Sequence, residues 1–443
     1  MAGSAGVAVA QQATPDYLST LRPDRWTEDW SWAEEAEPAP RLKSVSLGDT
    51  VTASFGADTY LRYELKDPLN FGVTGDRPQG AVFGRALVNA NVHIGERTRL
   101  YAELGAWNQS GKLQSTIFDE ADLAVQRAFV DHRFADRYLV RIGRQDLFDR
   151  SSRLLRAADA LNYQQVFDAA VIELSGPSTK TELYYAEPFL PQKGLLQRFN
   201  GLGNSRWAGF SHRSKDTPVK DLSYAVYGLW QDRDRVAYLQ IPGSEKRATG
   251  ILRATYSGAR TQAGVEVGRQ FGALGAARIA AWAFAADWSR TLGKDGAWAV
   301  NMRLDGASGD RKRTSENESW APIFPAMFFL GRSGIYNPTN AIGFYPEVSR
   351  KLTPKLSLSL AGEEVWRASR GSAFAAPGGL PLVRAGIPGS DHVLRGGTVE
   401  MRWKPTPAQE IRAKVFALEP RGAFRATGAD RLNGVTLNVI SRY

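Results

Sequence analysis

The chain of 443 residues contains no cysteine and only four histidines, which lie far apart in the sequence. The absence of thiols excludes disulfide scaffolds, thiolate zinc sites, iron–sulfur clusters and cysteine nucleophiles. Zinc-protease, phosphate-loop, dinucleotide and nucleophile-elbow motifs are also missing. We therefore expect a protein that is not an enzyme and needs neither a cofactor nor a metal.

Long apolar runs are missing as well. No stretch approaches the roughly 18 apolar residues that a membrane-spanning helix needs. This does not exclude a β-barrel, because barrel strands face lipid with only every second residue. The aromatic content of 11% favours strands and membrane interfaces.

The formal net charge is +10, and arginine supplies 42 of the 56 basic residues. A basic protein can bind nucleic acid, an anionic membrane surface or an acidic substrate. The arginines are scattered singly along predicted strands instead of forming runs. This spacing favours the wall of an aqueous lumen and argues against nucleic-acid binding.

A period of two begins near residue 51, which indicates half-buried strands. Leu61 and Tyr63 share one face of the first segment, whereas Arg62 and Glu64 share the other. Eighteen candidate strands start near residues 51, 81, 99, 121, 137, 166, 180, 206, 222, 247, 262, 278, 297, 341, 355, 393, 410 and 434. An even number is typical of bacterial single-chain barrels.

The connections between these strands alternate between short and long. Short ones lie at residues 95–98, 135–136, 176–178, 258–260, 293–296, 353–354 and 405–407. Long ones lie near residues 67–80, 108–120, 146–165, 187–205, 231–246, 305–340, 368–392 and 419–432. The alternation predicts an outer-membrane barrel with short periplasmic turns at one rim and long extracellular loops at the other.

The last strand ends on an aromatic residue, Tyr443, as outer-membrane barrels commonly do. Within lipid each unpaired backbone amide costs several kcal/mol, so membrane strands must form a closed ring. We therefore predict an all-β fold: a transmembrane antiparallel β-barrel of about 18 strands in the bacterial outer membrane. It should enclose a channel, have periplasmic termini and be a monomer.

Three segments follow from this interpretation. Residues 1–10 resemble the tail of an export signal, because Ala8-Val9-Ala10 precedes Gln11, although a disordered small-residue terminus would look the same. Residues 11–50 are predicted to form a periplasmic N-terminal segment. Residues 51–443 should form the barrel.

The predicted lumen wall carries a lane of arginines that could pass a polyanion, because a guanidinium stays charged and pairs well with a carboxylate. The predicted pathway residues are Arg62, Arg85, Arg127, Arg141, Arg303, Arg367, Arg402 and Arg412. The predicted counter-charges are Glu64, Asp131, Glu266, Asp305, Glu363 and Glu400. Ion pairs that only satisfy a polar interior remain the alternative. Arg144 falls on the apolar face, so we expect it beyond the membrane rim or near a bulge.

Two further features have open interpretations. Trp207, Trp230, Trp282, Trp288, Trp298, Trp366 and Trp403 lie mostly near predicted strand ends. They suit an interfacial girdle, although one or two could stack on sugars. The long connection 305–340 contains an apolar patch, Met327–Leu330, and either folds into the lumen as a gate or stays exposed outside.

Several short stretches, in order, resemble the alginate export family of outer-membrane proteins. They are Arg25–Trp30, Arg62–Glu64, Gln126–Asp131, Val140–Gln145, Ala307–Asp310, Ile323–Pro325, Leu356–Leu360 and Trp366–Arg367. The resemblance spans roughly residues 22–443. It implies an 18-stranded barrel whose basic lumen passes an acidic polyuronate out of the periplasm.

The leading hypothesis is a passive, anion-selective channel that exports an alginate-like polysaccharide. An uptake porin for small acidic or aromatic nutrients and an outer-membrane barrel hydrolase are the alternatives. Expected partners are outer-membrane lipid and lipopolysaccharide, the acidic polysaccharide or small acidic solute, and a periplasmic export partner.

Overall fold

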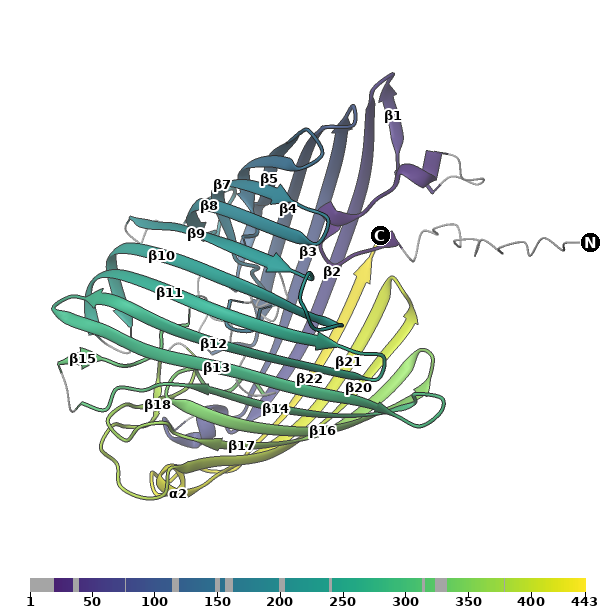
Figure 1. The fold of residues 1–443 in the computed structure, drawn as a ribbon. Coiled ribbons are helices and arrows are strands. Elements are labelled where there is room, and N and C mark those ends of the chain that lie inside the picture. Colours follow the sequence, from purple (N-terminus) through teal and green to yellow (C-terminus); the bar gives the residue numbers. More distant parts are fainter. Residues whose placement is uncertain are drawn as a thin grey trace, which may run out of the picture.

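The computed structural model describes residues 20–34, 40–75, 77–113, 119–147, 152–155, 162–198, 204–238, 241–312, 315–322, 333–377 and 379–443. Over these residues the chain forms a closed antiparallel barrel (Figure 1). Ring closure comes from β2 (Val51–Asp67), which pairs with the second strand, β3 (Gln79–Ile94), and with the last strand, β22 (Leu432–Arg442). The predicted signal remnant and the patch Met327–Leu330 lie outside the described residues.

Eighteen strands make the ring, as the sequence predicts. Between β3 and β22 they are β4 (Thr98–Ser110), β5 (Ala121–Phe134), β6 (Tyr138–Gln145), β7 (Val166–Ser175), β8 (Thr179–Phe189), β9 (Ser205–Ser214), β10 (Leu222–Tyr238), β11 (Ile241–Ser257), β12 (Thr261–Leu274), β13 (Ala277–Leu292), β14 (Trp298–Ala307), β16 (Ala341–Thr353), β17 (Leu356–Trp366), β20 (His392–Thr406) and β21 (Gln409–Pro420). Shorter strands outside the ring are β1 (Val45–Gly48), β15 (Glu316–Asn317), β18 (Phe374–Ala375) and β19 (Pro381–Val383). The helices that can be given bounds among the described residues are all short: η1 (Arg25–Thr27), η2 (Ser31–Glu34), η3 (Leu69–Gly72) and α2 (Gly422–Arg425). Among the described residues no helix is long and apolar enough to cross a membrane.

The two rims differ, as expected. We call the rim where β2 begins and β22 ends the turn end, because most connections there are short, and the opposite rim the loop end. One expectation is wrong: residues 231–246 are not a long connection. β10 continues to Tyr238 and β11 starts again at Ile241, so these two strands form a long hairpin at the loop end. Residues 275–276 make a second tight connection at this rim, between β12 and β13.

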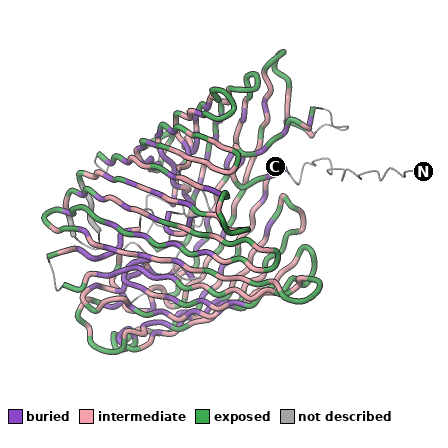
Figure 2. The backbone as a smooth tube through the Cα atoms, in the orientation of Figure 1, coloured by how far each residue is buried: buried purple, intermediate pink, exposed green. Residues whose placement is uncertain are grey.

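Alternation along each strand separates two environments (Figure 2). Outward residues are apolar and exposed, as with Leu61 (53%), Ile142 (60%) and Val415 (57%). Inward neighbours are charged yet covered, as with Arg62 (7% exposed) and Asp131 (5%). An apolar outer band around a polar interior is the pattern of a transmembrane barrel.

β22 pairs with β2 only from Asp58 onward, and residues 42–48 cover the first residues of the same edge of β2. Tyr443 exchanges two main-chain hydrogen bonds with Ala57, at 2.8 and 3.0 Å. Past this point the Phe55 amide donates to the Leu42 carbonyl oxygen at 2.8 Å, and Val45 pairs with Ala53. Residues 42–48 therefore continue the wall on the turn-end side of β22, which leaves this edge of β2 paired along its whole length.

Candidate functional site: the lumen

Charged side chains on β2 and β3 face the lumen, as predicted. Arg62 pairs with Glu64 at 3.2 Å, and Lys66 reaches the same carboxylate at 3.0 Å. The Arg62 guanidinium lies 4.3 Å from the centroid of the Phe83 ring. Arg85 lies 5.0 Å from the Tyr60 ring and donates to the main-chain oxygen of Asn162 at 3.2 Å. A predicted pathway residue, Arg62, and a predicted counter-charge, Glu64, therefore lie together in the structure.

A second cluster surrounds Asp131 near the turn end of β5. Arg141 on β6 donates to this carboxylate at 2.9 and 3.2 Å, and Arg99 on β4 also pairs with it. Both guanidinium groups lie over the Phe129 ring, at 4.7 and 5.6 Å. Sequence reasoning found Arg141 and Asp131 but missed Arg99, although Arg99 alternates with apolar Leu100.

Arg127 is more deeply engaged than a loose pathway residue would be. It is 3% exposed and forks onto Asp146 at 2.6 and 3.0 Å, while a third nitrogen pairs with Glu103. Its guanidinium also lies 4.7 Å from the Trp26 ring. Such a forked, buried pair fixes the side chain in place. Arg127 therefore serves as an oriented part of the wall.

On the opposite wall Arg303, a predicted pathway residue, pairs with Asp305, a predicted counter-charge, at 3.0 Å. The same carboxylate accepts from Arg153 at 2.9 Å, and Asp287 lies 3.9 Å from this second guanidinium. Burial is the largest cause acting on the Arg153 guanidinium, and it lowers the pKa of that group below its usual value. Sequence reasoning placed Arg153 in an external loop and so missed it.

A further lumen cluster surrounds Glu410 at the turn end of β20 and β21. Arg402 donates to Glu410 at 2.8 Å, Arg412 pairs with the same carboxylate, and Lys404 is 3.7 Å away. The arginine side chains are 43% and 42% exposed, so they are open to solvent. Predicted Glu400 lies directly across the ladder from Lys414. Glu410 itself was not predicted.

One predicted pathway residue does not lie on the wall. Arg367 follows the last residue of β17 and is 3% exposed within the loops at the loop end. It donates to Asp391 at 2.8 Å and to the Ile387 carbonyl at 2.9 Å. The Asp391 pKa is lowered, mainly by its hydrogen bond from Arg370 and also by Arg367. The prediction placed Arg367 one residue too deep, because the alternation of β17 stops at Trp366.

Arg144 lies at the loop end of β6, next to Gly143, whose φ is +126°. A Cβ at Gly143 would lie 2.3 Å from the Ala128 carbonyl oxygen, so the backbone there requires glycine. Arg144 pairs with Asp168 at 2.8 Å. Arg144 thus lies near the loop-end rim beside a residue of unusual backbone conformation, and the strand ladders continue through it without a bulge.

The described residues 152–155 of the long β6–β7 connection lie inside the barrel. The strip formed by these residues is held by the predicted counter-charge Glu266 on β12. This carboxylate accepts from the amides of Arg153 (3.0 and 3.1 Å) and Leu154 (3.1 Å), and from the Ser152 hydroxyl (3.2 Å). It also pairs with Arg253 at 3.3 Å. Glu266 therefore holds the inserted strip 152–155 against the inner wall, in addition to pairing with Arg253.

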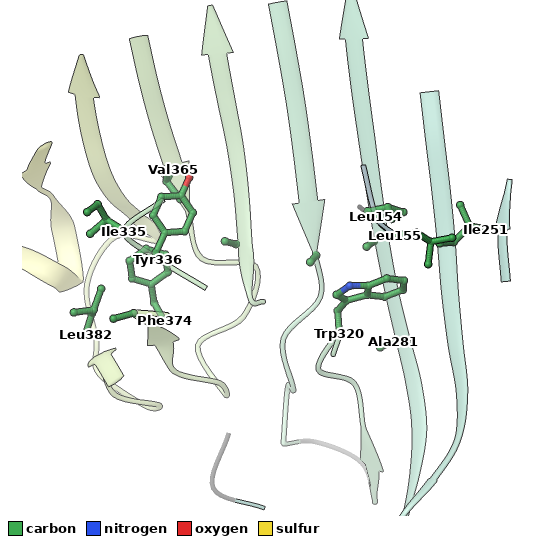
Figure 3. Close-up of a cluster of buried hydrophobic side chains, with 14 of the residues drawn as sticks. Leu154, Leu155, Ile251, Ala281, Trp320, Ile335, Tyr336, Val365, Phe374 and Leu382 are labelled. Atoms are coloured by element: carbon green, nitrogen blue, oxygen red, sulfur yellow. The ribbon is translucent and has the colours of Figure 1, made fainter. Parts of the chain in front are cut away.

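The β14–β16 connection folds inward too, which decides between the two expectations for its described parts. Trp320 is fully buried beside Leu154 in the loop half of the barrel (Figure 3). Gly268 makes room for both, because a Cβ there would meet Trp320 at 2.9 Å and Leu154 at 3.2 Å. The Ala321 backbone is fixed by Gln270, which in turn bonds Arg247 at 2.7 Å.

The same connection engages predicted Glu363. Tyr336 donates to Glu363 at 3.0 Å and shares a 2.7 Å hydrogen bond with Tyr345. Burial raises the pKa of the Tyr336 hydroxyl well above its usual value, and the neighbouring Tyr345 and Glu363 add to the shift. Tyr336 also packs on Phe374, as Figure 3 shows. Glu363 is thus a buried acceptor for an inserted loop.

Because residues 231–246 were predicted as a loop, sequence reasoning missed another charged cluster on β10 and β11. Glu245 and Arg247 lie on the inner face of β11, both fully buried, and Arg233 on β10 pairs with the same Glu245 carboxylate. The signal was present, because residues 243–257 keep a period of two with Arg247, Thr249 and Arg253 on one face.

The N-terminal segment, residues 20–34, enters the lumen at the turn end. Arg25 is 2% exposed and pairs with Glu28 and Asp58, both at 3.0 Å. Trp26 contacts Tyr101, with ring centroids 6.0 Å apart. Pro23 lines a small cavity together with Tyr60, Arg85, Glu103, Arg127, Gln164 and Arg442. This cavity therefore lies between the N-terminal segment and the inserted β6–β7 connection.

Of the seven tryptophans predicted for an interfacial girdle, four are exposed and one is buried. Trp230, Trp298, Trp366 and Trp403 are 37–43% exposed on the outer face. Trp207, in contrast, points inward, is 2% exposed and donates to the Ser205 hydroxyl at 3.0 Å. The prediction rested on the position of Trp207 near the start of β9, which does not fix the face that a side chain takes; the neighbouring Arg206 takes the outer face.

Comparison with known proteins agrees with this architecture. The family model described as alginate export matches residues 51–437. The chain belongs to the alginate export family. It is an outer-membrane channel protein, and one chain closes the whole barrel. No curated protein matches the chain in a sequence search.

Solved porins share the fold. OccAB1 of Acinetobacter baumannii has 11% identity and a TM-score of 0.59 over 88% of this chain and 96% of its own. OpdK of Pseudomonas aeruginosa, solved with vanillate, has 11% identity and a TM-score of 0.57 over 88% and 98%. OccK2 (OpdF) of Pseudomonas aeruginosa, in complex with glucuronate, has 10% identity and a TM-score of 0.58 over 88% and 97%. Among the described residues, no group of three or more histidine, aspartate or glutamate side chains is placed so that it could hold a metal ion.

Proposed function

We propose that the channel is passive and anion-selective and that it exports an acidic, alginate-like polyuronate. The observation that carries this is the sharing of lumen carboxylates. Asp131, Glu245 and Glu410 each serve two arginines, so each of the three clusters keeps a surplus positive charge. Two clusters lie near the turn end and one lies in the loop half. A diffusing carboxylate would therefore meet cations at both ends of the lumen.

This arrangement suits conduction better than tight binding. Each of these arginines is already paired with a protein carboxylate. Its attraction for a passing anion is therefore weaker than that of an unpaired guanidinium would be. Weak, repeated sites let a solute enter and leave, as conduction requires. The predicted pathway residues Arg141, Arg402 and Arg412 take part in these clusters. The turn end would face the periplasm, where the predicted N-terminal segment and any export partner would lie. Outer-membrane lipid and lipopolysaccharide would surround the girdle.

A second candidate, uptake of small acidic nutrients, has an observation in its favour. The lumen is narrowed from inside by the strip 152–155, by Trp320 and by the N-terminal segment, which suits a small solute. Structures that share the fold were solved with glucuronate and with vanillate.

Planar-bilayer recording of the full chain tests both proposals. A salt gradient should give a reversal potential on the anion side, and oligomannuronate should block the current where neutral oligosaccharides of equal length do not. Block by glucuronate alone would favour uptake of small acids. A cation-selective current would contradict both proposals.

A further inference from the structure

The N-terminal segment is bound at a defined seat and does not merely lie in the mouth of the barrel. Arg25 donates to Asp58 on β2 at 3.0 Å and to the main-chain oxygen of Tyr443 at 2.6 Å. Its third partner, Glu28, belongs to the segment itself. The guanidinium therefore fastens the segment to the seam where the barrel closes.

One residue later, Trp26 occupies a seat with a distinct chemistry. Its ring meets the Tyr101 ring edge-on, at 6.0 Å between centroids, and the Arg127 guanidinium lies 4.7 Å from its centroid. Arg99 donates to the Trp26 carbonyl oxygen. Tyr101 is itself stacked on Phe129, with centroids 5.2 Å apart. The seat thus consists of an aromatic platform flanked by two guanidinium groups.

This combination recognises an acidic sugar. The guanidinium of an arginine pairs with a carboxylate, and an aromatic ring receives the apolar face of a pyranose. The cations are oriented in advance, because Arg127 is held by Glu103 and Asp146, and Arg99 by Asp131. A solute anion would find these groups in place without paying to order them.

We propose that the Trp26 seat is a subsite for one acidic sugar unit, and that the chain's own N-terminal segment covers it in competition with the solute. The choice of solute rests on the proposed function. Competition lowers the apparent affinity by the fraction of time that the seat is uncovered. The Arg25 anchor sets this fraction, so weakening the anchor should raise the affinity for solute.

Single-channel recording of the full chain tests the inference with three variants. Trp26→Ala and Arg25→Ala should conduct more and be blocked by glucuronate and oligomannuronate at several-fold lower concentration. Arg22→Ala removes an equal charge from the same segment, where Arg22 donates to the Leu21 carbonyl oxygen, and should behave as the wild type. Adding Tyr101→Leu to Trp26→Ala should reverse the gain in block while the conductance stays high.

Equal block by solute in the wild type, Trp26→Ala and Arg25→Ala would overturn the inference, as would a gain that survives Tyr101→Leu. If either result were found but the channel were still anion-selective, the proposed channel function would stand without the Trp26 subsite. A wild-type channel without anion selectivity would contradict the proposed channel function itself. Since the chain has no cysteine, an Arg25→Cys/Asp58→Cys pair bridged by a cleavable thiol reagent gives a second measurement. Bridging should lower the sensitivity to block, and cleavage of the bridge should restore it; no change on bridging would refute the competition.

Discussion

Replacing Glu266 by alanine should release the strip 152–155 from the barrel wall. The Glu266 side chain is buried on β12 and accepts the main-chain amides of Arg153 and Leu154 at 3.0–3.1 Å. Alanine offers no acceptor, so the main-chain amides of Arg153 and Leu154 would lose their hydrogen-bond partner on the wall. Removal of one carboxylate thus acts on a whole constriction.

The size of the effect follows from these bonds. A hydrogen bond to a charged acceptor contributes about 1.5–3 kcal/mol, so the two amides together contribute about 3–6 kcal/mol. Since about 1.4 kcal/mol changes an equilibrium constant tenfold, the ratio of seated to released strip should fall by about two to four powers of ten.

Single-channel conductance and protease sensitivity of the β6–β7 connection measure this release. Glu266→Ala should conduct more and be cut faster near Arg153 than the wild type. Glu266→Gln is the matched control, because its carbonyl oxygen can still accept both amides, and it should fall between the two. Wild-type conductance and wild-type proteolysis of Glu266→Ala would refute the idea that this carboxylate holds the constriction.

Three further outcomes are expected. Lys43 lies 4.7 Å from the Trp30 ring, and burial lowers its pKa to about 8. The docked N-terminal segment should therefore gain stability as pH rises from 8 to 10.5, and channel opening should fall over the same range. Lys43→Met should remove this pH dependence. Arg402→Gln with Arg412→Gln should reduce anion selectivity in reversal-potential measurements without lowering the unfolding temperature, since both side chains are open to solvent; unchanged selectivity would argue against the turn-end cluster. Gly268→Val should lower the free energy of unfolding by about 1–3 kcal/mol because it displaces Trp320, and wild-type thermal stability would contradict this packing.

The wall of the barrel could be predicted because its rule is local. A strand in lipid must turn every second side chain outward, so Leu61 and Arg62 identify their own faces. Strand starts are therefore predicted to within two residues, with β11 as the exception. The start of β11 was missed because Asp232, Arg233 and Glu245 look like loop residues. In the structure β10 and β11 continue as a hairpin beyond the ends of β9 and β12.

The interior could be predicted only in part, because its partners come from segments without a period. The sequence indicates that Glu266 and Glu363 face inward, but it does not reveal that they bind the backbone of Arg153 and the hydroxyl of Tyr336. Those contacts depend on how the long connections fold back. Arg25 lies in a segment predicted to be periplasmic, and its contact with Asp58 joins positions that no periodicity relates.

The inserted segments explain how a strongly basic lumen can remain stable and still attract anions. Arg127 is deeply covered and two carboxylates hold it, so little charge remains there for a solute. The equally covered Arg247 shares the carboxylate of Glu245 with Arg233, whose side chain is partly exposed. Where solvent reaches the arginines, as around Glu410, one carboxylate serves two of them. A covered surplus charge would pay a desolvation cost, whereas an exposed one does not. An excess positive charge therefore destabilises the barrel least at the open mouth of the channel. This is also where an arriving polyanion first meets the protein.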